Sequence, residues 1–220
     1  MTAPPADPVA ELKILEATAL ACTKCDLAEG RTQVVFGSGD PQADLVFVGE
    51  APGQREDEQG VPFVGPSGQL LEELLGEIGL TRDQVYITNV VKCRPPRNRD
   101  PRQTEIDACK GYLRTQLQLI DPQVVVTLGN FSSKLLLNSE VGITRLRGTA
   151  YEWWGRHLVP TFHPAAALRG RGQVLEDIRY DFSLVRDILD GNLAPEAGTD
   201  QEALASEPAG DPQQLGLFGQ

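Results

Sequence analysis

A chain of 220 residues and 23.9 kDa has room for one domain with a sizeable core and some additional length, which argues against a two-domain protein. No run approaches the ~18 consecutive apolar residues of a membrane span, and residues 1–9 do not resemble a signal peptide, so we expect a soluble, cytoplasmic protein that binds no membrane. The formal net charge of −11 argues at first against a nucleic-acid partner, because binding to phosphates requires lysine and arginine on one surface.

The acidic residues are concentrated near the two ends of the chain. The segment from Asp190 onward contains six acidic residues and no basic one, and residues 1–16 carry a net charge of −2, which leaves only −3 for residues 17–189. Basic residues gather in this middle part, within 92–114 and 145–171. These stretches suit a DNA-binding face if they meet on one side of the fold, but they also suit an ordinary solvated surface.

Short apolar runs alternate with amphipathic patterns between residues 10 and 190. In chain order we expect a helix at 10–21, a strand at 44–49, a helix at 67–78, a strand at 85–90, a helix at 103–120, a strand at 124–128, a helix at 130–137, a strand at 158–162 and a helix at 174–189. This alternation predicts an α/β fold: a three-layer α/β/α domain with a central parallel sheet of about four strands. Residues 1–9 and 191–220 are expected to be disordered.

The loops that follow the predicted strands form the candidate site, because ligands of such sheets collect beyond the carboxyl ends of the strands. Asn89 ends the second strand, and His163 follows the fourth. Phe63 adds an aromatic ring from a further loop. Together they supply a stacking surface, a two-sided amide and a ring able to donate to an oxyanion. A lone histidine is more often a satisfied core residue, but His163 stands at a strand end before a proline.

The first strand ends in a tight turn, Gly49-Glu50-Ala51-Pro52-Gly53. Glycines around a proline let a ligand approach backbone NH groups closely, although such turns are common. The turn lacks the glycine spacing of a phosphate-binding loop, so a nucleotide cofactor is not expected.

Four cysteines indicate a metal centre. Cys22 and Cys25 form a C-x-x-C pair, whereas Cys93 and Cys109 stand 16 positions apart. Disulfides are not expected in the reducing cytosol, and four thiolates suit either a tetrahedral zinc ion or a four-iron, four-sulfur cluster. The single C-x-x-C pair favours the cluster, and buried inert thiols are the remaining alternative. We expect the Arg- and Pro-rich loop at 94–99 to be non-helical near its prolines and to be held against DNA by the cluster.

Motifs along residues 10–190 resemble those of the family 4, or type A, uracil-DNA glycosylases. The resemblance rests on the four cysteines and on GEAPG at 49–53, ED at 56–57, GxPFVG at 60–65, YITNVVKCRPPxNR at 86–99, TLG at 127–129 and HPA at 163–165. In this order the motifs are highly specific. The resemblance implies a uracil-DNA glycosylase-like fold, hydrolysis of the N-glycosidic bond of uracil in single- or double-stranded DNA during base excision repair, and a 4Fe-4S cluster. The cluster ligands would be Cys22, Cys25, Cys93 and Cys109.

The resemblance also assigns roles in base recognition. The uridine is extruded from the helix into a pocket, because its glycosidic bond cannot be reached inside the stack. Phe63 stacks on the uracil ring, Asn89 reads its Watson–Crick edge, and His163 donates to the uracil oxygen as negative charge grows there. Whether His163 is neutral or partly charged stays open. The other substrate-binding residues would be Gly49, Ala51, Pro52 and Gly53.

The attacking water needs orientation more than deprotonation once the sugar cation has formed. The family pattern places Glu50, Glu56 and Asn98 around this step, with Glu56 and Asn98 paired with each other. Without the resemblance, the charged run at 55–58 would be interpreted as a solvated face. The division of roles among the three residues stays open.

Two features depart from the family pattern. Residues 165–172 read AAALRGRG, where relatives often carry an aromatic residue and a longer loop, which would weaken the wedge or phosphate grip that supports flipping. No insertion precedes the histidine motif like that of related enzymes that trap themselves covalently on DNA, so turnover is expected.

The last residues of the chain resemble the Gln-Leu-x-Leu-Phe peptide by which bacterial repair and replication proteins dock on the sliding clamp. Apolar anchors on an acidic tether suit a groove on another protein, although packing against the chain's own domain is an alternative. Docking of this kind raises the local concentration of the enzyme at DNA. We expect the protein itself to be a monomer. The anchors would be Gln214, Leu215, Leu217 and Phe218.

Three other interpretations are compatible with the sequence. The first is a glycosylase of broader base preference that acts on hypoxanthine or mismatched thymine. The second is a non-catalytic iron–sulfur module that binds DNA or a polymerase and uses the cluster as a scaffold or redox sensor. The third is a structural protein that binds zinc.

Overall fold

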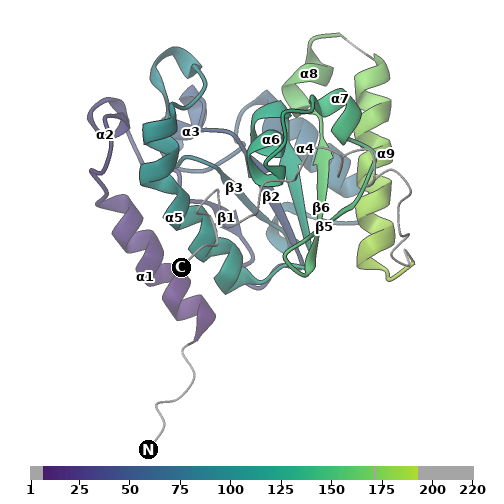
Figure 1. Ribbon diagram of the computed structural model, residues 1–220, viewed down its shortest axis with the longest axis horizontal. Coiled ribbons are helices and arrows are strands. Elements are labelled where there is room, and N and C mark those ends of the chain that lie inside the picture. Colours follow the sequence, from purple (N-terminus) through teal and green to yellow (C-terminus); the bar gives the residue numbers. More distant parts are fainter. Residues whose placement is uncertain (1–6, 171, 193–220) are drawn as a thin grey trace, which may run out of the picture.

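The computed structural model describes residues 7–170 and 172–192. Its centre is a six-stranded sheet with the order β1-β3-β2-β4-β6-β5, in which the four inner strands are parallel and the two edge strands are antiparallel to their neighbours (Figure 1). The four inner strands are the four predicted from the sequence. The strands are β1 (Ser38–Gly39), β2 (Leu45–Gly49), β3 (Tyr86–Asn89), β4 (Val124–Leu128), β5 (Tyr151–Trp153) and β6 (Arg156–Thr161).

The central parallel sheet of four strands is confirmed, but the two antiparallel edge strands were not predicted. β1 has two residues and β5 has three, which is too short for an alternating apolar pattern to stand out. β5 returns to β6 through Trp154 and Gly155, both of which have positive φ, at 58° and 73°. Two positive φ values in a two-residue hairpin loop match a type I′ turn, but tryptophan is not a usual residue there. The turn was therefore missed in the sequence.

The helices are α1 (Pro8–Leu20), α2 (Leu27–Gly30), α3 (Gln54–Gln59), α4 (Pro66–Glu77), α5 (Gln103–Ile120), α6 (Asn130–Leu137), α7 (Ile143–Leu146), α8 (Pro164–Leu168) and α9 (Gly172–Leu189), with 3-10 turns η1 (Arg82–Gln84) and η2 (Pro96–Asn98). The predicted bounds of α5 and α6 are confirmed. The four helices of six residues or fewer, α2, α3, α7 and α8, were not predicted, because a single turn or two carries little periodicity.

One local expectation was wrong. Residues 7–9 are ordered, because Asp7 caps α1 by accepting a hydrogen bond from the NH of Val9 at 3.1 Å and Pro8 occupies the first turn. The expected non-helical backbone near the prolines is found within η2, where Arg97 and Asn98 have positive φ, at 55° and 53°.

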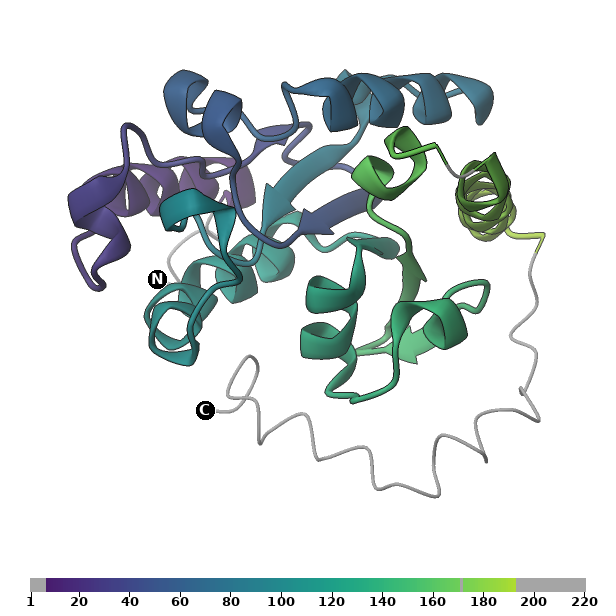
Figure 2. The ribbon, with the colours of Figure 1, turned by 90° about the horizontal axis from the view of Figure 1, so that it is seen from above.

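Side chains of each strand alternate between two helical layers, as pleating requires. Val46 and Val48 of β2 pack with α1, α5 and α6, whereas Leu45 and Phe47 pack on the other face with α4 and α9. Figure 2 shows the sheet seen from above between these layers. The leucines of α4 and the apolar residues of α9 recur at helical spacing on their buried faces. The predicted three-layer α/β/α class is confirmed.

Strand register brings the functional loops to one edge of the sheet. Gly49 lies beside Asn89 across β2 and β3, and Leu128 lies beside Thr161 across β4 and β6. The carboxyl ends of all four parallel strands therefore point the same way. Within the described residues, no helix is long and apolar enough to cross a membrane. The clamp-like peptide at 214–218 lies outside the described residues.

Candidate functional site

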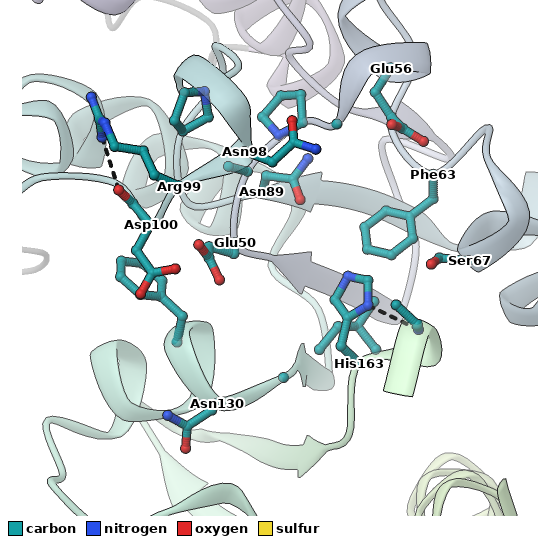
Figure 3. A pocket seen from close by; sticks show the side chains of 18 of the residues that line it. Glu50, Glu56, Phe63, Ser67, Asn89, Asn98, Arg99, Asp100, Asn130 and His163 are labelled. Atoms are coloured by element: carbon teal, nitrogen blue, oxygen red, sulfur yellow. Dashed lines mark hydrogen bonds between the residues drawn. The ribbon is translucent and has the colours of Figure 1, made fainter. Parts of the chain in front are cut away.

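A cavity of about 1330 Å³ opens at the carboxyl ends of the parallel strands. It is lined by side chains from the loops after β2, β3, β4 and β6. The cavity therefore lies beyond the carboxyl ends of the strands, where the sequence analysis expected the site. Figure 3 shows how these side chains point toward one another. The predicted residues that line it are Glu50, Ala51, Pro52, Gly53, Glu56, Phe63, Asn89, Asn98 and His163.

Gly49 does not line the cavity but sits beneath its floor. A Cβ at this position would lie 2.3 Å from Oδ1 of Asn89 and 2.9 Å from Cε2 of Phe63. The glycine is therefore needed so that the amide and the aromatic ring can both approach the end of β2. The side chain of Asn89 is 2% exposed, and within the described part of the chain it has no hydrogen-bond partner. Its amide is available to a ligand.

Phe63 is held in a strained backbone conformation, with φ at 52°. Arg82 fixes this loop by donating to the carbonyl of Phe63 at 2.9 Å and to the carbonyl of Pro62. Gly68 allows α4 to start directly under the loop, since a Cβ there would lie 1.8 Å from the Phe63 carbonyl oxygen. Strain of this kind persists only where the surroundings impose it, and it is common in ligand sites.

The imidazole of His163 faces the ring of Phe63, with the two centroids 5.6 Å apart and the planes 26° from parallel. Its Nδ1 accepts a hydrogen bond from the NH of Ala165 at 3.2 Å (Figure 3). Burial, together with the charge of the nearby Arg169, lowers the pKa of His163 to about 4, although Glu56 opposes the shift. The ring is therefore neutral at pH 7, with its proton on Nε2, so His163 is a neutral donor.

Glu50 and Asp100 bring two carboxyl groups together at the cavity wall (Figure 3). Burial, together with the charge and hydrogen bond of Asp100, raises the pKa of Glu50 to about 7. Glu50 therefore gains and loses a proton near neutral pH. The arrangement suits a group that exchanges protons with water.

The expected pairing of Glu56 with Asn98 was wrong. Oε1 of Glu56 accepts hydrogen bonds from the NH groups of Val64 and Gly65, both at 3.0 Å. Oδ1 of Asn98 instead accepts from Nε of Arg94 at 2.8 Å. Glu56 takes this position because α3 ends beside the N-terminus of α4, where free NH groups attract a carboxylate. It thereby supports the Phe63 loop from the cavity side.

The four predicted cysteine ligands line one small cavity between α1, α2, β3 and α5. All four are free thiols. Arg31 bridges two of their loops, because its Nη1 donates to Sγ of Cys93 at 3.4 Å and to the carbonyl of Cys22 at 2.7 Å. The backbone NH of Lys92 donates to Sγ of Cys109 at 3.3 Å. Donors to sulfur are what a thiolate-bound cluster needs around it.

The described residues contain no group of three or more His, Cys, Asp or Glu side chains arranged to hold a single metal ion. A four-iron cluster is larger than one ion and separates its ligands more widely. Four cysteines around one cavity supply the number of thiolates that such a cluster takes.

Comparison with known proteins gives the same assignment as the motifs. A family model for the uracil DNA glycosylase superfamily matches residues 36–182. A type-4 uracil-DNA glycosylase of Sulfurisphaera tokodaii is 46% identical over 189 residues, which cover 80% of this chain and 84% of that protein. Type-4 enzymes of Archaeoglobus fulgidus and Thermotoga maritima are 45% and 46% identical, covering 77% and 75% of this chain and 88% and 90% of theirs. The chain belongs to the type-4 uracil-DNA glycosylases. The resemblance inferred from the motifs is confirmed.

Three residues of this type-4 glycosylase were missed in the sequence. Asp100 follows Asn98 by two positions. It could have been predicted, because it is an acidic residue in a loop that follows a strand. The bidentate contact of Arg99 with the buried Glu105, at 2.8 and 2.6 Å, holds the loop that carries it. Arg82 and Lys92 had no such signal, because the backbone carbonyls that they hold carry no mark in the sequence.

Lys92 is fully buried beside the cysteines and the base pocket. Its Nζ donates to Oγ1 of Thr88 at 2.6 Å and to the carbonyl of Asn89 at 2.8 Å. Burial lowers the pKa of Lys92 to about 7, although the thiols of Cys109 and Cys93 oppose the shift. The residue connects the cysteine site of the type-4 glycosylase to the backbone that carries the Asn89 amide.

Both basic stretches reach the cavity. Arg99 comes from the first stretch and Arg169 from the second, and Arg55 and Lys134 add positive charge from α3 and α6. The two stretches therefore meet around one opening, as a DNA-binding face requires.

Proposed function

We propose that this chain hydrolyses the N-glycosidic bond of uracil in DNA, as the initiating step of base excision repair. The observation that carries the proposal is the neutral His163, with its Nε2 proton, in one cavity with the Asn89 amide and the Phe63 ring. A cavity of about 1330 Å³ is larger than a nucleobase needs, so it also admits the flipped sugar and phosphate.

Recognition of uracil is assigned to Phe63 and Asn89. The ring of Phe63 offers a flat apolar surface to the base. The unpartnered amide of Asn89 accepts from the imide NH of uracil and donates to its carbonyl. Cytosine presents the opposite pattern, which leaves buried groups unpaired at a cost of about 1–3 kcal/mol.

Bond cleavage leaves a uracil anion and a sugar cation. The electron pair of the glycosidic bond moves to the base, where Nε2 of His163 donates a hydrogen bond to the oxygen that gains negative charge. A neutral donor already in place stabilises this charge without reorganisation. His163 therefore need not transfer its proton.

Attack by water completes the reaction. We assign the water to Glu50, which is half-buried and close to Asp100. The ionised form of this pair stabilises the sugar cation and accepts the proton that the water loses as its oxygen bonds to the sugar. Glu56 and Asn98 hold the surrounding loops, Glu56 through Val64 and Gly65.

We further propose that Cys22, Cys25, Cys93 and Cys109 hold a 4Fe-4S cluster. When bound, it cross-links the α1–α2 loop, the loop after β3 and α5. These segments include the Arg- and Pro-rich loop and the start of α5, which carry Asn98 and Asp100 to the cavity. The role assigned to the cluster is structural.

Two partners complete the proposal. The enzyme acts as a monomer on uracil-containing DNA, and the peptide at 214–218 docks it on a sliding clamp. The test of docking is capture of the purified chain by immobilised clamp and its loss in Phe218→Ala. Equal capture of both chains would show that this peptide is not the contact.

The test of activity is incubation with an oligonucleotide that carries one uracil, followed by alkaline strand scission. Scission at uracil is expected, with cytosine, thymine and hypoxanthine substrates as controls. His163→Ala and Asn89→Ala should lower the rate while DNA binding and the brown colour of the cluster survive. Undiminished binding without any base release by the native chain would favour the non-catalytic module instead.

A further inference from the structure

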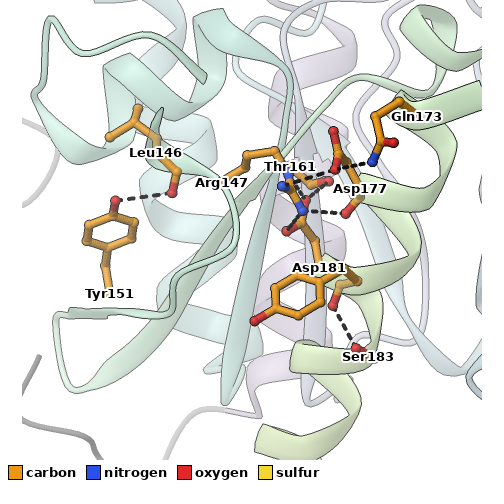
Figure 4. A network of polar contacts seen from close by, with 9 residues as sticks. Leu146, Arg147, Tyr151, Thr161, Gln173, Asp177, Asp181 and Ser183 are labelled. Atoms are coloured by element: carbon orange, nitrogen blue, oxygen red, sulfur yellow. Dashed lines mark hydrogen bonds and ion pairs between the residues drawn. The ribbon is translucent and has the colours of Figure 1, made fainter. Parts of the chain in front are cut away.

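A buried ion pair joins two helical segments behind the loop of His163 (Figure 4). Asp181 of α9 is fully buried, and Arg147 follows α7. Nε of Arg147 donates to Oδ2 of Asp181 at 3.0 Å, and Nη2 donates to Oδ1 at 2.7 Å. The guanidinium thus binds both carboxylate oxygens, and this bidentate contact is the most directional form of ion pair. Neither residue lines the cavity.

The same carboxylate holds the end of β6. Oγ1 of Thr161, the last residue of that strand, donates to Oδ2 of Asp181 at 2.6 Å. The carbonyl of Thr161 accepts from the NH of Gly129 at 2.9 Å. The next residue, Phe162, has its ring 5.9 Å from Cζ of Arg147. Both residues that precede His163 are therefore in contact with the ion pair.

Stability alone does not account for this arrangement. Replacing a buried ion pair by apolar residues of similar volume is often neutral or stabilising, because taking two charges out of water is costly. The ion pair instead fixes the position of the end of β6, because its hydrogen bonds are directional. Two positions after Thr161 comes His163, the histidine that is proposed to donate to the base.

We propose that Arg147, Asp181 and Thr161 form a clamp that positions the imidazole of His163 for the reaction. The clamp consists of positioning residues, because none of them touches the cavity, and the inference rests on the proposed role of His163. Contacts of His163 with Ala165 and Phe63 orient its ring within the loop. The clamp sets the loop as a whole against the sheet, and small displacements of a reacting group lower rates strongly.

The first test is Thr161→Val, which removes the donor and keeps the branched shape. We expect kcat on a uracil oligonucleotide to fall about tenfold while KM changes less than twofold. Thr161→Ser, which retains the hydroxyl, should recover most of the rate. Glu77→Gln is the matched control, because it removes the surface ion pair between Glu77 of α4 and Arg179 of α9, at 2.8 Å, and leaves the clamp intact. Its kcat should equal that of the native chain.

A double-mutant cycle separates positioning from general destabilisation. In a His163→Ala background, Thr161→Val should leave the single-turnover rate unchanged, because the group that it displaces is gone. The chain has two histidines, so an imidazole NMR spectrum should show shifted signals for His163 and unchanged ones for His157. If Thr161→Val does not fold, Arg147→Lys takes its place, since an ammonium cannot grip both oxygens.

Several results would overturn the clamp. One is an equal loss of rate for Thr161→Val in the native and His163→Ala backgrounds. Another is no loss of rate in the native background, and a third is unchanged NMR signals of His163 in Thr161→Val. A native chain that releases no uracil would instead refute the proposed function, and the NMR comparison would still decide whether the clamp positions the ring.

Discussion

Glu50 and Asp100 lie at the cavity wall, where the proposed reaction requires one negative charge. Glu50 is half-buried and Asp100 is exposed, so a proton on Glu50 has a path from the cavity to solvent. Apart from burial, Asp100 is the neighbour that raises the pKa of Glu50. In the proposed mechanism, ionisation of Glu50 controls the attack by water.

Asp100→Asn should move the pH dependence of the enzyme. Because the pKa of Glu50 is raised to about 7, activity that needs its carboxylate falls as pH drops below that value. Removing the neighbouring negative charge lowers the pKa of Glu50, so the acidic limb of the kcat/KM profile should shift to lower pH. The pKa of His163, at about 4, is too low to produce this limb. An unchanged profile would show that Asp100 does not act on Glu50.

Gly49→Ala should lower kcat/KM about 100-fold, because a methyl group 2.3 Å from Oδ1 of Asn89 must displace the amide or the Phe63 ring. Gly76→Ala is the control. Gly76 is exposed in α4 with no atom within 4 Å of the added Cβ, so this change should raise stability by about 0.5–1 kcal/mol and leave kcat/KM unaltered. Steady-state rates and urea denaturation measure the two effects. A Gly49→Ala enzyme with native kcat/KM would contradict the close packing of Asn89 and Phe63 against Gly49.

At the scale of elements, the loops of the site are held in place by side-chain contacts. The Phe63 loop is held by Arg82 and Glu56, and the loop of Asp100 is held by Glu105. The loop after β3 also leads to Cys93, so the cysteine site and the cavity share one segment. Such loops need support because they lack a regular ladder of backbone hydrogen bonds.

Removal of the cluster should loosen this segment first. Treatment with an oxidant and a chelator is expected to lower the melting temperature and to increase hydrogen–deuterium exchange in residues 93–102, while β4 stays protected. Cys109→Ser should reproduce the pattern without the treatment. Unaltered exchange after loss of the visible absorbance would mean that the cluster does not brace the loop.

For the whole molecule, the two helical layers position the sheet whose edge forms the site. Phe182 of α9 is 1% exposed and stacks on Phe47 of β2, with ring centroids 5.6 Å apart. α9 carries Asp181 next to it, so this packing also supports the clamp behind His163.

Phe182→Ala should destabilise the fold by about 3–5 kcal/mol, because it removes a buried ring and leaves a cavity between layers. Leu20→Ala is the comparison, since Leu20 is 54% exposed and should cost less than about 0.5 kcal/mol. Urea denaturation followed by circular dichroism measures both. Similar losses in the two variants would contradict the assignment of Phe182 to the core.

Residue patterns along the chain determined the four parallel strands, the bounds of α5 and α6, the four cysteines and the positions of Phe63, Asn89 and His163 at the strand ends. These follow from the sequence because periodicity and strand ends are properties of near neighbours. The tertiary structure alone decided the antiparallel edges, the partner of Glu56, the presence of Asp100 and the neutral state of His163. Each of these depends on which distant groups packing brings together and on how much water it removes around them, and spacing along the chain carries neither quantity.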